Sequence, residues 1–432
     1  MKKISSRAVS VLLIAALVIG GLGLFISRYL TDGRKWALSF ANANSGSSGE
    51  VFDRNGVTLA RFDATQNAFS PDWLTRISCY HVTGDYWNRT GTGVLTRFWN
   101  DILDYSPFTG TTHGQAKSFT LNIDSKLNIA AFEALGANRK GAAMVVNYRT
   151  GELLCMVSSP SVDPASADAD PPDGAYFNRG ISLSFVPGSV FKLVTAAAAI
   201  ETVPNMYDRT FLCEGVYEIA GVEINCTGEH GTQTFEEAMA NSCNCAFAQI
   251  AVKIGHENMI KYVRDYGFLD THSIDGIGTV AGSYPTEFIG DPELAWSCIG
   301  QSTDMMCPFS MLRFVSAVAN GGMLCEPRLI HSEDAPETVR LVNADTADKL
   351  RQMMSFNVSY HYGQENFPGL RLCAKTGTAE LGDGTSHAWF TGFLDDEEHP
   401  YAFVVLVERG GGGLSVAGEA ANKILQAAVK ET

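Results

Sequence analysis

Ser189 and Lys192 stand three residues apart at the start of an otherwise almost wholly apolar stretch, VPGSVFKLVTAAAAIE (186–201). Side chains three apart on a helix share a face, so the hydroxyl and the amine can meet. A serine hydroxyl becomes a strong nucleophile when a base takes its proton, and a lysine can be that base when burial lowers its pKa. The pair therefore predicts nucleophilic catalysis. A helix-capping serine beside a lysine that reaches solvent is the alternative that this stretch alone leaves open.

Two further tripeptides carry the same kinds of group. Residues 242–244 (Ser-Cys-Asn) place a hydroxyl and an amide at a predicted helix start, and residues 375–377 (Lys-Thr-Gly) place an amine and a hydroxyl on a predicted strand. The glycine of the second tripeptide lets a ligand or another backbone approach the strand closely. A second Ser-x-Asn occurs at residues 355–357, but it follows a charged amphipathic segment only 20 residues before Lys375. We therefore favour the tripeptide at 242–244, which lies in a loop between two helices.

Helices and strands are predicted on both sides of these residues. TFEEAMANSCNCAFAQIAVKIG (234–255) predicts two helices with a break; Thr234 and Glu237 form a capping box, Asn241 or Ser242 caps the second helix, and Gly255 ends it. Residues 121–136 predict a strand end and a helix closed by a glycine, and residues 141–160 predict two strands joined by a turn. A turn dipeptide, Asn-Gly, joins two short β-like runs near residue 55.

Three successive strands are predicted near the C-terminus, at residues 371–380, 387–395 and 401–408, and a closing helix at 417–430. Consecutive strands with short connections usually pair antiparallel. The sequence therefore predicts an α+β fold with an antiparallel sheet flanked by helices.

Composition limits the partners. The chain has 432 residues, 45% of them hydrophobic, and a formal net charge of −15. This length suits two or three domains with a sizeable core. Phosphate binding needs clustered Lys and Arg, so the acidic balance speaks against a nucleic-acid partner.

The N-terminus carries 19 uncharged residues, AVSVLLIAALVIGGLGLFI (8–26). A helix of this length crosses most of a bilayer core of ~30 Å. A cleaved signal peptide has a shorter apolar stretch and a nearby cleavage site, so we favour an uncleaved anchor, followed by a polar linker at 41–49. Lys2, Lys3 and Arg7 predict a cytoplasmic N-terminus with the bulk of the chain outside, although basic residues also follow the apolar stretch.

The ten cysteines are scattered along the chain. Cys213 and Cys226, followed by His230, could be unpaired, form a disulfide loop, or contribute to a metal site. Cys243 and Cys245 are too close for an easy disulfide and are expected to matter for position.

The three motifs, SxxK, SxN and KTG in this order, form the set found in penicillin-interacting serine enzymes. The chain resembles a monofunctional (class B) penicillin-binding protein, a peptidoglycan D,D-transpeptidase. The resemblance extends over nearly the whole chain after the anchor, through the stretches DRNGVTLA (53–60), LNIDSKLN (121–128), TGELLCMVSSP (150–160), NRGISLSFVPGSVFK (178–192), AWSCIGQ (295–301), ANGGMLCEP (319–327) and HAWFTGF (387–393). It implies a cytoplasmic tip and anchor at 1–35, a short non-catalytic domain at 36–116 and a transpeptidase domain at 117–432.

The resemblance also assigns roles to residues. It implies an acylated nucleophile, its general base and a proton relay to the leaving amine: Ser189, Lys192 and Ser242. The implied substrate-binding residues are Asn244, which holds a peptide amide, Lys375, which supplies positive potential, Gly377, and the carboxylate-binding Thr376 and Thr378. The backbone N–H groups of Ser189 and Thr378 would form the oxyanion hole. The sequence departs from the family pattern at Cys243, inside SxN, and at Ser302, where many relatives have glycine.

The implied reaction cross-links peptidoglycan stem peptides through a serine acyl-enzyme and needs no metal or organic cofactor. β-Lactams would acylate the same serine, and the family usually works beside a polytopic membrane glycosyltransferase and other wall-synthesis proteins. The same site could serve a D,D-carboxypeptidase or a serine β-lactamase. A membrane sensor would need more transmembrane segments or a cytoplasmic domain, and an inactive scaffold is disfavoured by the three complete motifs.

Overall fold

A computed structural model describes residues 2–43, 49–62, 67–106, 110–111, 116–136, 139–166, 170–287 and 289–430. The chain divides into two compact units. The first comprises Met1–Glu50, Ala60–Ala68 and Phe98–Ser118, and the second comprises Val51–Leu59, Phe69–Arg97 and Phe119–Thr432. The units interleave along the chain, and the predicted domain limits at residues 36–116 and 117–432 stay predictions. All residues of the three motifs belong to the second unit.

The first unit contains the long N-terminal helix α1 (Lys2–Ala43). Within it, Arg7–Tyr29 is long and apolar enough to cross a membrane, with a mean hydropathy of 2.8. The predicted apolar stretch at 8–26 lies inside this span. Of the predicted linker at 41–49, residues 41–43 are helical and residues 44–48 lie outside the described part of the chain. The unit also holds the short elements α5 (Trp99–Ile102), β4 (Tyr105–Ser106) and β5 (Gly110–Thr111).

A four-stranded sheet has the order β3-β2-β1-β6. Its strands are β1 (Glu50–Phe52), β2 (Thr58–Phe62), β3 (Asn67–Phe69) and β6 (Phe119–Thr120), with β1 and β6 parallel. β1 and β2 are neighbours, and Gly56 between them has a φ of 80°, as the predicted Asn-Gly turn requires. Three short helices follow: α2 (Trp73–Ser78), α3 (Tyr80–Thr83) and α4 (Val94–Arg97).

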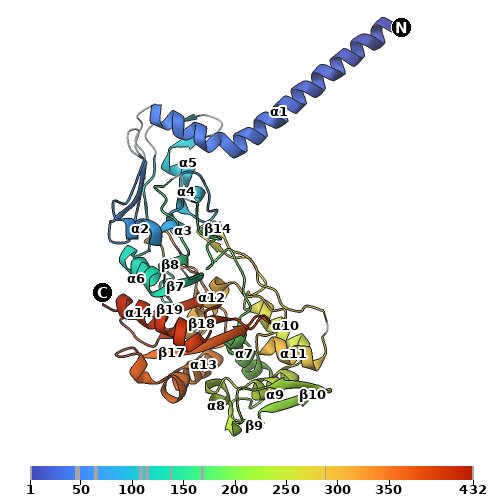
Figure 1. Cartoon of the computed structure of the whole chain (residues 1–432), viewed down its shortest axis with the longest axis vertical. Helices are drawn as coiled ribbons and strands as arrows, with labels where there is room; N and C mark the ends of the chain where they lie inside the picture. Colours follow the sequence, from blue (N-terminus) through green and yellow to red (C-terminus); the bar gives the residue numbers. More distant parts are fainter. Residues whose placement is uncertain are drawn as a thin grey trace. The chain divides into compact units, whose positions relative to one another are not determined.

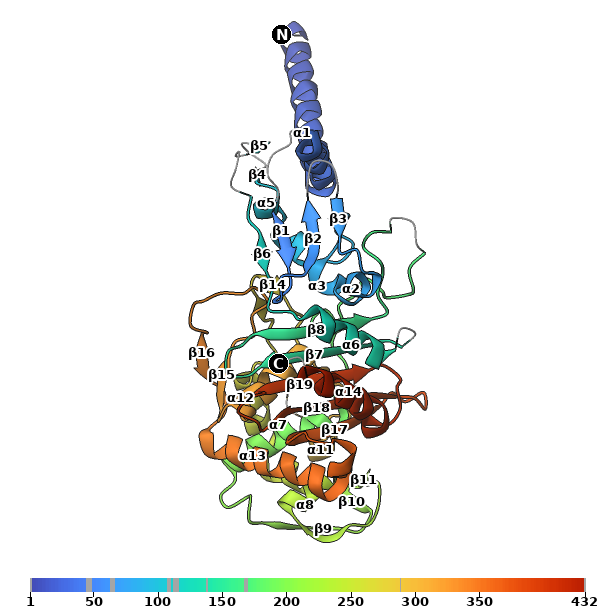
Figure 2. The same ribbon diagram turned by 90° about the vertical axis from the view of Figure 1, so that its left-hand side faces the viewer.

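The second unit is built on a five-stranded antiparallel sheet of order β17-β18-β19-β7-β8 (Figure 2). The strands are β7 (Gly141–Asn147), β8 (Leu153–Ser159), β17 (Leu372–Glu380), β18 (Ser386–Leu394) and β19 (Tyr401–Val407). The central strands are buried along almost their whole length, which explains their near-continuous apolar runs. The predicted strands and their antiparallel pairing are confirmed, and with them the α+β fold.

Helices cover the sheet (Figures 1 and 2). α6 (Ser125–Leu135) and α14 (Glu419–Ala428) share one hydrophobic core with the sheet, and α12 (Pro308–Ala319) packs against β18 and β19. The other helices are α7 (Lys192–Thr202), α8 (Phe235–Ala240), α9 (Asn244–Ile254), α10 (His256–Asp265), α11 (Asp291–Cys298) and α13 (Ala344–Asn357). Shorter helical turns are η1 (Gly188–Phe191), η2 (Val358–Tyr362), η3 (Gln364–Asn366) and η4 (Gly413–Gly418).

Four pairs of short strands also lie in the described part of the second unit. Among them, β9 (Thr210–Cys213) pairs with β12 (Gly231–Thr234), and β10 (Val216–Ile219) pairs with β11 (Val222–Asn225). The remaining two pairs are β13 (Ser273–Ile274) with β14 (Ile277–Gly278), and β15 (Met323–Cys325) with β16 (Thr338–Arg340).

Local signals mark three of the predicted helix ends, and one predicted cap is corrected. The Thr234–Glu237 capping box is present, and Gly136 and Gly255 close α6 and α9 as predicted. The predicted cap of the second helix at Asn241 or Ser242 is wrong, because the N-cap of α9 is Cys243, whose Sγ accepts from the Ala246 N–H at 3.4 Å. An N-cap has extended backbone, which Cys243 has, whereas Ser242 has a φ of 50°.

Candidate active site

Ser189 lies in η1, a 3-10 turn, and Lys192 begins α7 directly after it. The sequence predicted both residues on one helix. In a 3-10 turn, residues three apart eclipse one another, so the two side chains still point to the same side. Lys192 Nζ lies 3.0 Å from Ser189 Oγ. Ser189 as a residue is half-buried, unlike the fully buried Lys192.

Lys192 is fully buried, and this burial lowers its pKa to about 8. Besides Ser189, its Nζ contacts the backbone oxygen of Ser242 at 2.6 Å and Oδ1 of Asn244 at 2.7 Å. Both of these oxygens can only accept hydrogen bonds. A neutral amine has two N–H donors and one lone pair, so it can donate to both oxygens and still accept the Ser189 proton. The surroundings therefore suit Lys192 as a base.

The side-chain amide of Asn244 is also held by a hydrogen bond to the backbone of Asn225. Its Nδ2 donates to the backbone oxygen of Asn225 at 2.9 Å, which turns Oδ1 toward Lys192. Asn244 is the first residue of α9, so the helix start fixes where this amide lies.

Ser242 forms the tight turn between α8 and α9. Its φ of 50° is in the left-handed region, a strained conformation for a residue with a side chain. The turn directs Oγ between two amines, 3.3 Å from Lys192 Nζ and 3.0 Å from Lys375 Nζ. A hydroxyl in this position can pass a proton between Lys192 and a group beside it.

Lys375 is also fully buried, on the edge strand β17. Its Nζ bonds Ser242 Oγ and the backbone oxygen of Thr376, each at 3.0 Å. Burial, and next the charge of Lys192, lowers the pKa of Lys375 well below its usual value. Two buried amines thus share one hydroxyl, and they come from α7 and β17, two elements far apart in the sequence.

Thr376 and Thr378 continue along β17, and Thr378 is exposed. The hydroxyl of Tyr362, a residue outside every motif, accepts from the Thr376 N–H at 3.0 Å and lies 3.2 Å from Thr376 Oγ1. Gly413 donates its N–H to Thr378 Oγ1 at 3.2 Å. Gln301, at the end of the stretch AWSCIGQ, donates to the Thr378 backbone oxygen at 3.1 Å.

Glycines let three backbones meet at this site. A Cβ on Gly377 would come 3.0 Å from the oxygen of Pro187, so the close approach predicted for Gly377 is made by another backbone. A Cβ on Gly188 would come 2.8 Å from the oxygen of Thr378, and the Gly188 N–H donates to the Gly300 oxygen at 2.9 Å. Ser189 is therefore held between β17 and the loop after α11.

The second Ser-x-Asn is not part of this cluster. Ser355 is exposed on α13, and Asn357 is buried and donates to the Ala374 oxygen at 2.8 Å. The structure thus brings Ser189, Lys192, Ser242, Asn244 and Lys375 into one hydrogen-bonded cluster, with Thr376, Gly377 and Thr378 following on the same strand.

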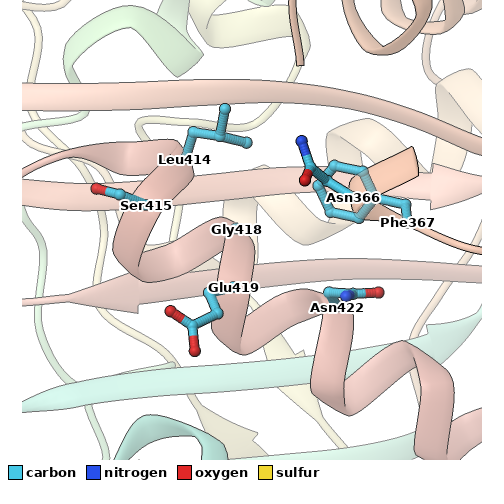
Figure 3. A pocket seen from close by; sticks show the side chains of 7 residues that line it. All are labelled: Asn366, Phe367, Leu414, Ser415, Gly418, Glu419 and Asn422. Carbon is cyan, nitrogen blue, oxygen red and sulfur yellow. The ribbon is translucent and has the colours of Figure 1, made fainter. Parts of the chain in front are cut away.

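Of the hollows on the described part of the second unit, two differ in their relation to the site. One of about 380 Å³ (Figure 3) contains none of the predicted site residues and is lined by Asn366, Phe367, Leu414, Ser415, Gly418, Glu419 and Asn422. The other, of about 460 Å³, continues the site past Thr378 and is lined by Glu293, Trp296, Gln301, Ser302, Glu380 and Gly382. This second hollow gives an extended ligand room beside the end of β17.

The family described as "Penicillin binding protein transpeptidase domain" matches residues 141–426. The chain is 31% identical over 308 residues to stage V sporulation protein D of Bacillus subtilis, covering 66% of this chain and 47% of that protein. It is 30% identical over 389 residues to peptidoglycan D,D-transpeptidase PbpA of Mycobacterium tuberculosis, covering 78% of this chain and 79% of that protein. The chain thus spans about half of the first relative and most of the second.

The fold is similar to that of penicillin-binding protein A from M. tuberculosis, solved as a ceftriaxone acyl-enzyme complex, with a TM-score of 0.79 and 23% identity over 90% of this chain and all of that one. It is also similar to the D,D-transpeptidase domain of a peptidoglycan glycosyltransferase from Eggerthella lenta, with a TM-score of 0.76 and 24% identity over 90% of this chain and 99% of that one. With the matching family covering well over half of its length, this chain belongs to the penicillin-binding protein transpeptidase family.

Proposed function

We propose that this chain is a peptidoglycan D,D-transpeptidase that works through a Ser189 acyl-enzyme and is inhibited by β-lactams. One observation carries the proposal: Lys192 is buried 3.0 Å from Ser189 Oγ, with two acceptor-only oxygens that satisfy the N–H groups of its neutral form. The name of the M. tuberculosis relative supports this assignment of activity.

In the first step, Ser189 Oγ attacks the penultimate D-Ala carbonyl carbon and its proton passes to Lys192 Nζ. The carbon–nitrogen bond to the terminal D-Ala then breaks, and the leaving amine takes the proton by way of Ser242 Oγ, which lies 3.3 Å from Lys192 Nζ. In the second step, an amine of a neighbouring stem peptide attacks the ester, and the same groups carry its proton back to Ser189. The product is the cross-link, and Ser189 is regenerated.

Substrate binding falls to the β17 edge and the Ser242–Asn244 turn. Thr376 and Thr378 hydroxyls bind the terminal carboxylate, and Lys375 adds positive potential beneath them. Thr378 accepts from Gly413, so its own hydroxyl proton is free to point to a carboxylate. The Ser189 and Thr378 N–H groups form the oxyanion hole, where one donor is typically worth ~3–4 kcal/mol of barrier.

Asn244 binds the substrate's peptide amide. Both ends of its side chain already bond protein atoms, Lys192 Nζ and the Asn225 oxygen. An amide keeps a second lone pair on Oδ1 and a second N–H on Nδ2, so Asn244 can hold a substrate without releasing Lys192.

The remaining proposals concern the setting. The apolar span Arg7–Tyr29 is a single membrane anchor with the transpeptidase domain (117–432) on the extracytoplasmic side, joined through a short non-catalytic domain at 36–116. A polytopic glycosyltransferase and other wall-synthesis proteins are the expected partners.

A fluorescent penicillin tests the function in the full chain held in detergent. We expect a stable covalent adduct on the wild type and none on Ser189→Ala, while Ser355→Ala, which changes the second Ser-x-Asn, labels like the wild type. A synthetic stem peptide with a free D-amino acid as acceptor then separates the activities: exchange of the terminal residue indicates transpeptidation.

Each alternative gives a different result. Release of terminal D-Ala without exchange indicates a carboxypeptidase, and rapid loss of the label as hydrolysed drug indicates a β-lactamase. No labelling of the wild type would overturn the proposal and favour a scaffold.

A further inference from the structure

Four side chains that could ligate a metal converge behind the Ser242 turn. The ligand atoms of Cys213, Cys226, His230 and Cys243 all lie within 4.8 Å of one another. Cys213 ends β9, Cys226 follows β11, His230 precedes β12, and Cys243 caps α9. Three segments, the end of β9, the connection 226–230 and the start of α9, thus bring three thiols and one imidazole together.

The separations match a tetrahedral zinc centre. Cys226 Sγ lies 3.8 Å from Cys243 Sγ, and His230 Nδ1 lies 3.4 Å from Cys213 Sγ and 3.6 Å from Cys226 Sγ. With Zn–S of ~2.3 Å and Zn–N of ~2.0 Å, tetrahedral geometry requires about 3.8 Å between sulfurs and about 3.5 Å between sulfur and nitrogen. Three thiolates and one imidazole are also a ligand set that structural zinc sites use.

A disulfide fits the same atoms less well. A disulfide needs ~2.05 Å between sulfurs, and all ten cysteines are free. A disulfide would also leave the third thiol and the imidazole without a role. The surroundings suit thiolates: the Ala246 N–H donates to Cys243 Sγ at 3.4 Å, as outer hydrogen bonds to metal thiolates do.

The short strands beside these ligands need further stabilisation, which a bound metal would supply. β9, β10, β11 and β12 are four residues each, form two separate two-stranded sheets, and are exposed at about half or more of their positions. Two-stranded sheets of this size are marginal in water without further support. A bound metal supplies the missing stabilisation, because its binding free energy becomes folding free energy.

The cluster is directly joined to the active site. Cys243 stands between Ser242 and Asn244, and Cys226 follows Asn225, whose oxygen accepts from Asn244 Nδ2 at 2.9 Å. Fixing Cys226 and Cys243 therefore fixes both the strained turn at Ser242 and the amide that contacts Lys192. The metal would position these groups and take no part in the acyl transfer.

We propose that Cys213, Cys226, His230 and Cys243 bind one structural zinc ion that holds the Ser242–Asn244 turn in place. The proposal stands apart from the transpeptidase activity, because metal content is measured without any substrate. A chain that fails to react with penicillin can still bind zinc, so the two failures are distinguishable.

Metal content of the purified full chain is the first test. We expect about one zinc ion per chain and, after exchange, the intense visible bands of tetrahedral cobalt thiolate. Cys213→Ser, Cys226→Ser, Cys243→Ser and His230→Ala should each lower zinc occupancy at least fivefold. Cys325→Ser is the matched control. Cys325 is a buried cysteine outside the cluster whose Sγ donates to the Arg149 oxygen, so this variant should keep the metal. Cys245→Ser, next to the cluster but outside the ligand set, should also keep it.

The wild type alone gives a second test that needs no variant to fold. Chelation should lower penicillin labelling at least tenfold, and Zn²⁺ but not Mg²⁺ should restore it. Absence of zinc together with an intact mass about 2 Da lower, the signature of a disulfide, would overturn the proposal. Full zinc content in every ligand variant would also overturn the proposal. If Cys245→Ser lost zinc while Cys243→Ser kept it, the assigned ligand set would be wrong.

Discussion

Lys192 Nζ and Asn244 Oδ1 lie 2.7 Å apart, although 52 residues separate them in the sequence. The contact joins the start of α7 to the start of α9 and orients the amine toward Ser189. Because Asn244 is itself bonded to Asn225, the position of the base depends on a residue outside all three motifs. The protonation of Lys192 is thus the first property to test.

The acylation of Ser189 by penicillin should depend on pH through Lys192. Only the neutral amine can take the serine proton, and burial lowers the Lys192 pKa to about 8. The neutral fraction grows as pH rises through this value, so the second-order acylation rate constant should increase about tenfold from pH 7 to pH 9. Stopped-flow or quenched labelling across this range checks it, with thermal melts to show that the fold is unchanged.

Lys192→Ala should lower the rate by a factor of about 10² or more at every pH, as loss of a general base does. A rate that is flat between pH 7 and pH 9 in the wild type would rule out Lys192 as the group that limits acylation.

Asn244→Asp should move this pH profile upward. A carboxylate 2.7 Å from Nζ favours the charged lysine, so the Lys192 pKa rises and the neutral base becomes scarcer at any given pH. We expect the midpoint of the acylation profile to rise by at least about 1. Asn244→Ala, which removes the amide without adding charge, should slow acylation and leave the midpoint unchanged or lower. Superimposable profiles for Asn244→Asp and the wild type would show that this contact does not set the lysine's charge.

Much of the fold follows from local sequence signals. The strands of the central sheet, the Thr234–Glu237 capping box and the glycines that end α6 and α9 are all predictable, since each depends on a few adjacent residues. The three motifs also identify the residues that meet in the cluster, because the resemblance to a family supplies the long-range information that a single pattern lacks.

What the sequence did not predict depends on tertiary contacts. Cys243 caps α9 because the left-handed backbone at Ser242 leaves the next residue extended, and neither asparagine nor serine in that turn can take the position. Tyr362 reaches Thr376 from a helical turn with no motif of its own. The convergence of Cys213, Cys226, His230 and Cys243 needs the strand pairs in place, so spacing alone left a disulfide, a metal and free thiols open.

Tyr362→Phe should lower both the stability of the protein and the rate of acylation. The buried Tyr362 hydroxyl accepts from the Thr376 N–H, and its removal leaves that donor unpaired. We expect unfolding free energy to fall by about 1–3 kcal/mol, with a several-fold slower acylation because Thr376 loses its support. Burial raises the Tyr362 pKa to about 12, so this effect should be the same at pH 7 and pH 9.

Tyr148→Phe provides the matched control for Tyr362→Phe. Its buried hydroxyl donates to the Leu394 oxygen at 3.3 Å, on the opposite end of β18 from the site. It should lower stability by a comparable amount and leave acylation unchanged. Equal acylation defects in the two variants would show that Tyr362 acts only through general stability.

Gly300→Ala should displace the nucleophile. Gly300 has a φ of 76°, and an added Cβ would come 2.3 Å from the backbone oxygen of Gly188, the residue before Ser189. Backbone atoms cannot give way as a flexible side chain can, so η1 must shift against β17. Gly369→Ala isolates the backbone cost alone, because Gly369 has a φ of 74° with nothing within 4 Å of its added Cβ. We expect Gly369→Ala to lose about 1 kcal/mol of unfolding free energy with normal acylation. Gly300→Ala should lose more stability and at least tenfold in acylation rate. Chemical denaturation measures the unfolding free energy, and penicillin labelling measures the acylation rate. Equal acylation rates in both variants would contradict the tight packing of η1 against the loop that contains Gly300.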